Sequence, residues 1–259
     1  MKLIKKLMAS AVLAASVAAP AMASNINVGG VIWNPDAAID FFALAGMIHQ
    51  DINNTTGEVS GYGLIDAINN NSTNIFCPGC ELTFQFSGFM PIGGVVLPSL
   101  STTSILYTGG IVNVYVHAPA GIITGNVDSM TTANTGLNGG ALWLQLAGHT
   151  LNGRTLKGDV TVDDQGTATT ADDQIAGLTG TGLLDAIGGL AYGNFNTNTR
   201  ADGSDMSFFS SFTDLRPDNN PNNANGNGNF KSNTIPEPGS LALLGLGLLG
   251  AAVARRRKA

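Results

Sequence analysis

Ile111-Val-Asn-Val-Tyr-Val-His117 decides the fold class, because valine occupies every second position along it. Successive side chains of a strand point to opposite faces, so this alternation predicts a half-buried strand. The segments Leu82-Thr-Phe-Gln-Phe86 and Ala141-Leu-Trp-Leu-Gln-Leu-Ala147 repeat the pattern. The second of them has Thr155–Val162 as its predicted partner across the turn Asn152-Gly153. The sequence therefore predicts an all-β fold.

The stretch around these strands, residues 24–215, has roughly 190 residues, which suits one large β-rich domain or two small ones. Gly, Thr, Ser and Asn are plentiful in it, whereas Lys and Glu are scarce. This composition favours short strands and many tight turns, so we expect a sandwich or a jelly-roll-like domain. One segment, Asp36–His49, is a candidate for a short helix near the N-terminus or for a buried strand.

The N-terminus has the three parts of a secretory signal peptide. Its basic residues are Lys2, Lys5 and Lys6. An uncharged apolar run follows over Leu7–Pro20, and small residues then lead to Ala23. We predict a signal peptide over residues 1–23, cut by signal peptidase between Ala23 and Ser24; an uncleaved N-terminal anchor is the alternative.

The C-terminus carries a second tripartite signal over residues 235–259. Pro236-Glu237-Pro238 precedes an apolar run, Leu241–Ala254, and a basic tail follows at Arg255-Arg256-Arg257-Lys258. We predict a short transmembrane helix at 241–254, with the basic tail at 255–258 on the cytoplasmic side. Residues 216–234 are rich in Asn, Pro and Gly, and are predicted to be a disordered linker.

The order of Pro-Glu-Pro, apolar run and arginine cluster resembles the PEP-CTERM sorting signal. That resemblance implies recognition by an exosortase, transient anchoring in the inner membrane, and final release to the cell surface or the extracellular space. It also implies a Gram-negative host that makes exopolysaccharide. Residues 180–212, which include Gly-Thr-Gly-Leu-Leu-Asp and Asn-Phe-Asn-Thr-Asn-Thr, resemble an extracellular domain of unknown function found in such proteins. An ordinary C-terminal membrane tail is the alternative.

Without its two end signals the chain is strongly acidic. Five basic and seventeen acidic residues remain, which gives a net charge of −12. Such a surface repels phosphate backbones, so nucleic acid is excluded as a partner. The pairs Asp163-Asp164 and Asp172-Asp173 form a candidate Ca²⁺ site, because Ca²⁺ prefers carboxylate oxygens. Solvated acids at the tip of a hairpin are the alternative, and no other cofactor is predicted.

The two cysteines stand close together as Cys77-Pro-Gly-Cys80. Pro-Gly favours a turn and an exported protein permits disulfides, so we predict a structural disulfide between them. A redox site would need the pair at a helix N-terminus, and the sequence that follows is strand-like instead. Free thiols and metal binding stay open as further alternatives.

One eight-residue unit occurs twice. Gly61-Tyr-Gly-Leu-Ile-Asp-Ala-Ile68 is echoed by Gly180-Thr-Gly-Leu-Leu-Asp-Ala-Ile187. Each copy is followed by a Phe-containing strand-like segment, at Leu82 and at Met206 respectively. The echo predicts two related strand-loop-strand units, and chance similarity in a Gly-rich chain is the alternative.

The sequence has no Gly-x-Ser-x-Gly nucleophile motif, and its three histidines have no recognisable catalytic spacing. We therefore expect a non-enzymatic surface or extracellular-matrix protein, with exopolysaccharide or biofilm as its candidate partner. A secreted hydrolase acting on matrix polysaccharide and a calcium-stabilised adhesin are the alternatives.

Overall fold

The computed structural model describes residues 24–120, 130–136, 140–163, 174–215 and 222–235. Within them the chain is almost entirely β-strand, which confirms the all-β prediction. The strands are β1 Ile26–Val28, β2 Val31–Trp33, β3 Phe41–Ile52, β4 Val59–Ile65, β5 Ala67–Ile68, β6 Asn71–Ser72, β7 Glu81–Pro91, β8 Ser104–His117, β9 Gly140–Gly148, β10 Leu156–Asp163, β11 Gln174–Gly188, β12 Met206–Leu215 and β13 Asn223–Ser232. Two single-turn helices, α2 Thr73–Phe76 and α3 Tyr192–Phe195, lie at one end.

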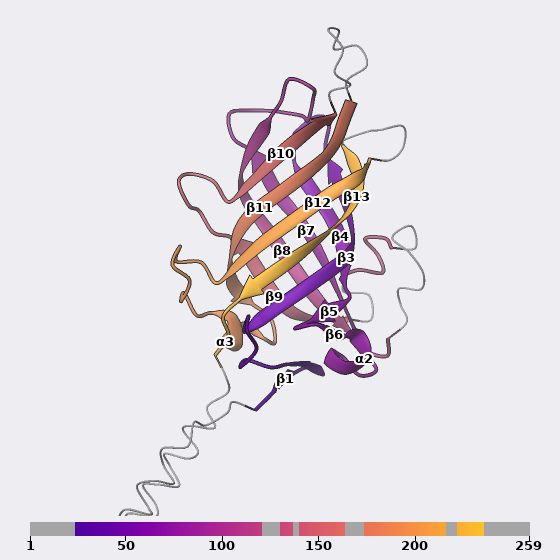
Figure 1. Ribbon diagram of the computed structural model, residues 1–259, viewed down its shortest axis with the longest axis vertical. Coiled ribbons are helices and arrows are strands. Elements are labelled where there is room, and N and C mark those ends of the chain that lie inside the picture. Colours follow the sequence, from indigo (N-terminus) through magenta and orange to yellow (C-terminus); the bar gives the residue numbers. More distant parts are fainter. Residues whose placement is uncertain (1–23, 121–129, 137–139, 164–173, 216–221, 236–259) are drawn as a thin grey trace, which may run out of the picture.

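The main sheet closes on itself to form a barrel (Figure 1). Its neighbouring strands run antiparallel in the order β3, β4, β7, β8, β10, β11, β12 and β13. β13 then pairs with β3, from Asn223 opposite Asp51 to Ser232 opposite Phe41. The two layers expected of a sandwich are therefore the two sides of one closed sheet, and closure leaves no long unpaired edge.

Strands β9 and β10 share one place in the barrel. The lower half of β8, residues 111–117, pairs with β9, whereas residues 104–107 pair with β10. β11 likewise pairs with both. The predicted pairing of these two strands with each other is therefore wrong. The Asn152-Gly153 turn has positive φ at both residues and lies between Leu151 and Arg154, which bridge each other. It therefore belongs to the short loop that connects the end of β9 to the start of β10.

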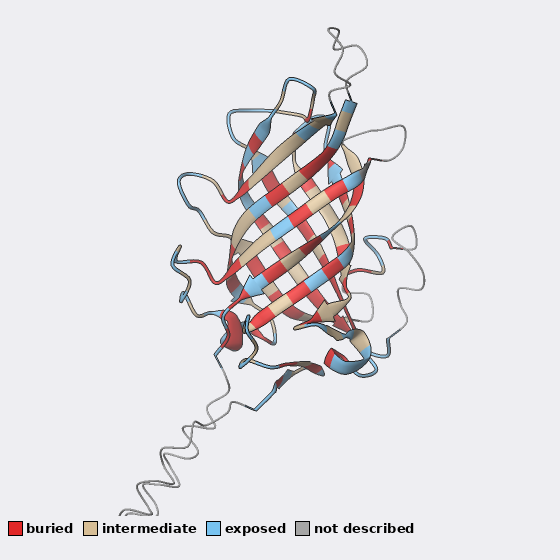
Figure 2. Ribbon diagram, viewed as in Figure 1, coloured by how far each residue is buried: buried red, intermediate tan, exposed pale blue. Residues whose placement is uncertain are grey.

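Buried residues alternate with less buried ones along many of the barrel strands (Figure 2), and most of the buried side chains are apolar, so the barrel has an apolar interior. Burial raises the pKa of Tyr107 to about 12. Side chains fill most of the interior and leave a cavity of about 50 Å³ among Phe84, Phe86, Leu178 and Phe212. The hydrophobic core therefore lies inside the barrel, and other segments must cover the two ends of the barrel to shield it from water.

β3 corrects the expectation of a helix near the N-terminus. Residues 41–52 form a strand, as the alternative interpretation of this segment predicts. Every second residue at its start, Phe41, Ala43 and Ala45, is buried. The pairing with β13 shifts between Ala45 and Ile48, and Ile48 then resumes the inward set. This bulge changes the phase of the alternation, so the apolar residues fall at helix-like intervals in the sequence.

β13 corrects the predicted linker. Residues 216–234 were expected to be disordered, but Asn223–Ser232 pairs with β12 along one side and with β3 along the other. Ala224 and Phe230 are buried, at 0% and 3% exposed. The segment needs few apolar side chains of its own because two neighbouring strands satisfy its backbone hydrogen bonds.

The repeated unit occupies equivalent places on opposite sides of the barrel. Its first copy lies in β4 and β5 and pairs with β7, so that Ile65 stands opposite Leu82. Its second copy lies in β11 and pairs with β12, so that Leu184 stands opposite Met206. β4 and β11 are four places apart in the closed order.

In the described part of the chain, no helix is long and apolar enough to cross a membrane. The apolar run at 241–254, predicted to do so, lies outside that part.

Candidate functional site at the barrel base

The end of the barrel that carries β1, β2, α2 and α3 is called the base, and the opposite end the far end (Figure 1). The chain also reaches the base at the end of β13, where the C-terminal sorting signal begins. Because this junction is the place where processing would occur, the base is the candidate functional site.

Four aromatic rings close the base. Trp33, Phe41, Trp143 and Phe195 are each 2% exposed or less. Their ring centroids lie between 4.7 and 6.3 Å apart, mostly edge to face. The Trp143 indole N–H donates to the backbone oxygen of Val28, 2.9 Å away, which holds the β1–β2 hairpin across the opening. The N-terminal hairpin and three other elements therefore meet in one rigid plug.

The junction itself is fixed to this plug through Thr234. Its backbone N–H and its hydroxyl both donate to the carboxylate of Asp40, at 2.6 and 2.7 Å. The indole N–H of Trp33 donates to the same hydroxyl at 3.2 Å. The next residue, Ile235, donates its N–H to the backbone oxygen of Asn194, whose side-chain amide donates back to the Ile235 oxygen. We call these contacts the junction clamp.

Asp205 orders the loop that follows α3. It is 1% exposed and accepts N–H groups from Ala186, Thr197 and Asn198 at 2.6–2.9 Å. The hydroxyl of Ser232 donates to the Asp205 backbone oxygen at 2.7 Å. The Asp205 carboxylate is therefore satisfied by backbone donors, and the Asp205 backbone oxygen connects the same loop to the end of β13.

Asp202 lies in the same loop, and its carboxylate accepts hydrogen bonds from Arg200 and Ser204. Partial burial raises its pKa, but hydrogen bonds from Ser204 and the pairing with Arg200 outweigh that effect. The pKa of Asp202 consequently lies below its usual value. The Arg200 and Asp202 side chains are 3.3 Å apart.

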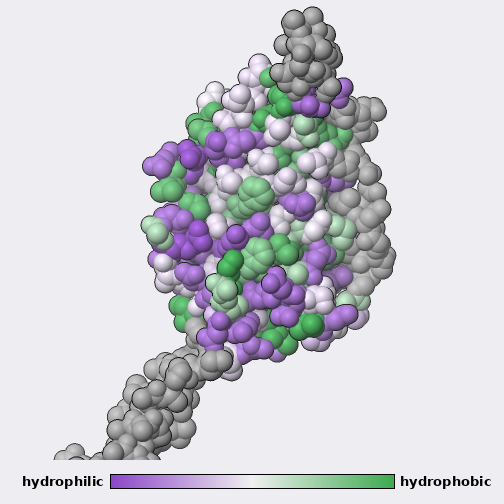
Figure 3. Space-filling model, in the orientation of Figure 1, coloured by the Kyte–Doolittle hydropathy of each residue, from purple (hydrophilic) through white to green (hydrophobic). Residues whose placement is uncertain are grey.

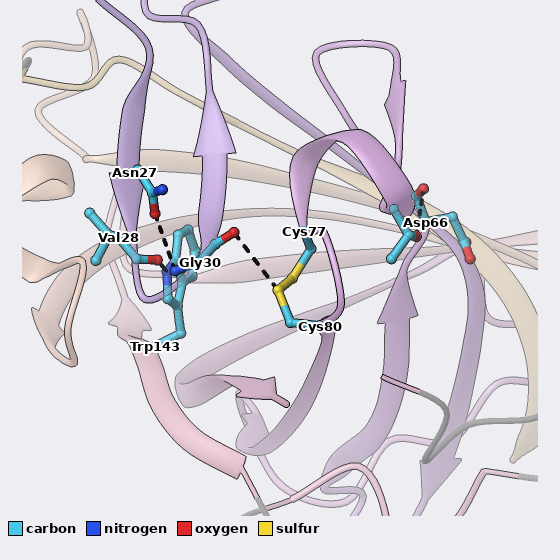
Figure 4. The surroundings of a disulfide bond; sticks show 8 residues. Asn27, Val28, Gly30, Asp66, Cys77, Cys80 and Trp143 are labelled. Atoms are coloured by element: carbon cyan, nitrogen blue, oxygen red, sulfur yellow. Dashed lines mark hydrogen bonds between the residues drawn. A yellow bond between two sulfur atoms is a disulfide. The ribbon is translucent and has the colours of Figure 1, made fainter. Parts of the chain in front are cut away.

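Cys77 and Cys80 form a disulfide directly after α2 (Figure 4). Both are buried, at 1% and 4% exposed. Figure 4 shows Cys80 beside Gly30 of the β1–β2 turn, whose backbone oxygen lies 3.8 Å from the Cys80 sulfur. The disulfide therefore packs against the N-terminal hairpin, where it acts as a brace of the base.

The three histidines lie far apart in the barrel, and each has its own partner. His149 contacts the carboxylate of Asp185 at 2.8 Å. His117 is fully buried and shares a 2.8 Å hydrogen bond with Thr83. His49 stacks on Tyr62 with centroids 4.9 Å apart, on the outer wall.

Most residues of the predicted processing and metal sites lie outside the described residues. These are Ala23, Asp164, Asp172, Asp173, Pro236, Glu237, Pro238, Arg255, Arg256 and Arg257. Ser24 is exposed at the start of the described chain, and Asp163 ends β10. Over the residues described, no group of three or more His, Cys, Asp or Glu side chains could hold a metal ion. The Ca²⁺ site therefore stays a prediction.

The sequence reasoning missed the junction clamp. Thr234 and Asp40 are 194 residues apart, and Thr234 was placed in the predicted linker. The only local signal is that Thr234 directly precedes Ile235-Pro236, the start of the C-terminal signal.

A protein-family comparison finds the PEP-CTERM protein-sorting motif at residues 234–258. The chain thus carries the C-terminal signal of an exported, exosortase-sorted protein. No curated protein and no solved structure matches the chain significantly. The motif begins at Thr234, so its first two residues are those that the clamp holds.

Proposed function

We propose that this chain is a non-enzymatic surface or extracellular-matrix protein that an exosortase releases beyond the inner membrane, where it associates with exopolysaccharide. The observation that carries the proposal is the position of the sorting motif. It starts where β13 has already closed the barrel, so a cut after Ile235 leaves every strand in place. Processing would then deliver a folded domain.

The outer wall supports a polysaccharide partner. Hydrophilic and hydrophobic residues are interspersed over the face in Figure 3. On β3 and β4, the stacked pair of His49 and Tyr62 stands beside Asn225 and Asp51. The Tyr62 hydroxyl is protonated at neutral pH and can donate a hydrogen bond. Burial and the charge of Asp51 raise its pKa further. An aromatic face next to amide and carboxylate groups suits a sugar ring.

Other aromatic residues are less suited to that role. Trp143 and Phe195 are 1% and 0% exposed in the aromatic plug, so a sugar ring cannot reach them. The proposal therefore places the polysaccharide contact on the wall at Tyr62.

The hydrolase and the calcium-stabilised adhesin remain alternatives with tests of their own. Release of reducing sugar from the host's polysaccharide would favour the hydrolase. A melting temperature that rises with Ca²⁺ and falls with EDTA would favour the adhesin.

Fractionation of the host with and without exosortase tests the sorting half of the proposal. We expect the chain in the inner membrane without exosortase and in the surface or medium fraction with it. Intact mass would then locate both cuts. Retention in the membrane despite active exosortase would contradict the proposal.

Co-sedimentation of the released chain with purified exopolysaccharide tests the binding half. Tyr62→Ala should weaken it, whereas the matched control Tyr192→Ala, which removes a 39% exposed tyrosine at the base, should bind like the unmodified chain. Equal binding by both variants would exclude Tyr62 as the contact.

A further inference from the structure

The exit point of the anchored segment is fixed in space. The hydrogen bonds of Ile235 to Asn194 hold the chain on the base. Only residues 236–240 separate Ile235 from Leu241, where the predicted membrane segment begins. A fully extended chain covers at most about 3.5 Å per residue, so Leu241 lies within roughly 20 Å of Ile235.

This short reach decides which end of the barrel can meet the bilayer. β8 has 14 residues, and a strand rises about 3.3 Å per residue, so β8 is roughly 45 Å long. Barrel strands tilt by about 35–45°, so the barrel is roughly 35 Å tall along its axis. The far end therefore lies beyond the reach of the connection when the barrel stands on its base.

Four large apolar or aromatic side chains are exposed near the exit point, among exposed polar residues such as Asn196 and Asn233. Ile187, Leu190, Tyr192 and Ile235 are 48%, 57%, 39% and 48% exposed. They lie close in the fold, because Ile187 lies at the lower end of β11, Leu190 follows that strand and Tyr192 begins α3. α3 in turn holds Ile235 through Asn194. We call these four residues the base patch.

The base patch is also free of charge, in a domain whose net charge is −12. Residues 24–35, 186–199 and 232–235, which surround the exit point, contain no Asp, Glu, Lys or Arg. Of the charged groups at the borders of these stretches, Asp40 holds Thr234, Asp185 contacts His149 and Arg200 pairs with Asp202, whereas Asp36 is exposed. The four residues of the base patch and their immediate chain neighbours therefore carry no acidic group that would repel an anionic lipid surface.

We propose that the base patch docks on the outer surface of the inner membrane while the chain is anchored, so that the barrel stands upright on the bilayer. The inference rests on the proposed function, because it needs the membrane segment. Isoleucine and leucine side chains lie at the headgroup and acyl boundary, and Tyr192 sits at headgroup level, as aromatic residues do at membrane interfaces. The bilayer is the occupant because the tether leaves the patch beside it.

Fluorescence quenching in liposomes tests this orientation. The full chain would be reconstituted into phosphatidylcholine vesicles that contain a lipid with a nitroxide near its headgroup. Leu190→Cys and Val95→Cys would carry the same environment-sensitive dye. Leu190 is 57% exposed in the base patch, and Val95 is 54% exposed between β7 and β8 at the far end, so the two sites are matched. Tyr192→Cys provides a second probe of the patch.

We expect the probe at Leu190 to be quenched at least about twofold more than the probe at Val95, with Tyr192 following Leu190. Equal quenching in vesicles that carry the chain would overturn the docking proposal alone. If the unlabelled chain failed to float with the vesicles, the membrane segment itself would be wrong, and both this inference and the proposed sorting would be overturned. An unchanged emission maximum of the buried Trp33 and Trp143, measured in vesicles without nitroxide, would show that the labelled chains remain folded.

Discussion

Phe230→Ala distinguishes a closing strand from a linker at the C-terminal side of the domain. Phe230 is 3% exposed and lies on β13. Its ring lies 5.4 Å from Phe84 and 5.0 Å from Phe208, centroid to centroid. Truncating a buried Phe to Ala costs about 3–5 kcal/mol of unfolding free energy, because it removes these contacts and leaves a cavity. For a domain of this size, that lowers the melting temperature by about 6–20 °C.

The matched control is Phe209→Ala on the neighbouring strand β12, where the ring is 41% exposed and should cost less than about 1 kcal/mol. Urea unfolding of the purified chain would be followed by the fluorescence of Trp33 and Trp143, which are buried and therefore report unfolding. If residues 223–232 were a linker, the two variants would unfold at the same urea concentration. That result would refute the closed barrel.

Three further variants probe the base. Asp40→Ala removes the acceptor of two hydrogen bonds from Thr234, so we expect a loss of about 3 kcal/mol in urea unfolding; an unchanged midpoint would mean that the clamp is not formed in solution. Replacing both Cys77 and Cys80 by Ser should cost about 2 kcal/mol, because the disulfide closes a very short loop, and the same loss should follow reduction of the unmodified chain. Burial raises the pKa of Asp66, and the hydrogen bond from the Gly46 backbone N–H only partly opposes this. The protonated Asp66 side chain therefore stabilises the fold at low pH, and this contribution is lost as the pH rises through the raised pKa. Asp66→Asn should therefore gain melting temperature relative to the unmodified chain as the pH rises from about 4 through the raised pKa of Asp66, and a constant difference would contradict the shift.

The sequence predicted the strands whose apolar residues alternate without interruption, such as Leu82–Phe86 and Ile111–His117. It failed on β13 for a physical reason. Asparagine occupies positions 223, 225, 227 and 229, so a period of two is present. However, the inward positions between them hold Ala and Gly rather than large apolar residues, and composition alone indicated disorder. The strand is stable because β3 and β12 flank it, and a single-sequence pattern contains no information about those partners.

The junction clamp was beyond sequence reasoning for a related reason. Trp33, Asp40 and Thr234 are brought together only when the first long strand pairs with the last. The sorting motif, by contrast, is contiguous in the chain and needs no tertiary structure to be recognised. For this reason the sorting signal can be recognised from the sequence, whereas the contacts of the junction clamp cannot.

The pairing of β13 with β3 also sets an order of events during export. When a chain crosses the membrane from its N-terminus, β3 is the first barrel strand to emerge and β13 is the last. One edge of β3 therefore stays unpaired until nearly the whole domain has emerged. An unpaired strand edge is a template for aggregation, and it persists for as long as the C-terminal part is held back. The predicted membrane segment at 241–254 would keep β13 beside the membrane as the open sheet arrives. Barrel closure and the arrival of the sorting motif at the membrane would then be a single late step of biogenesis.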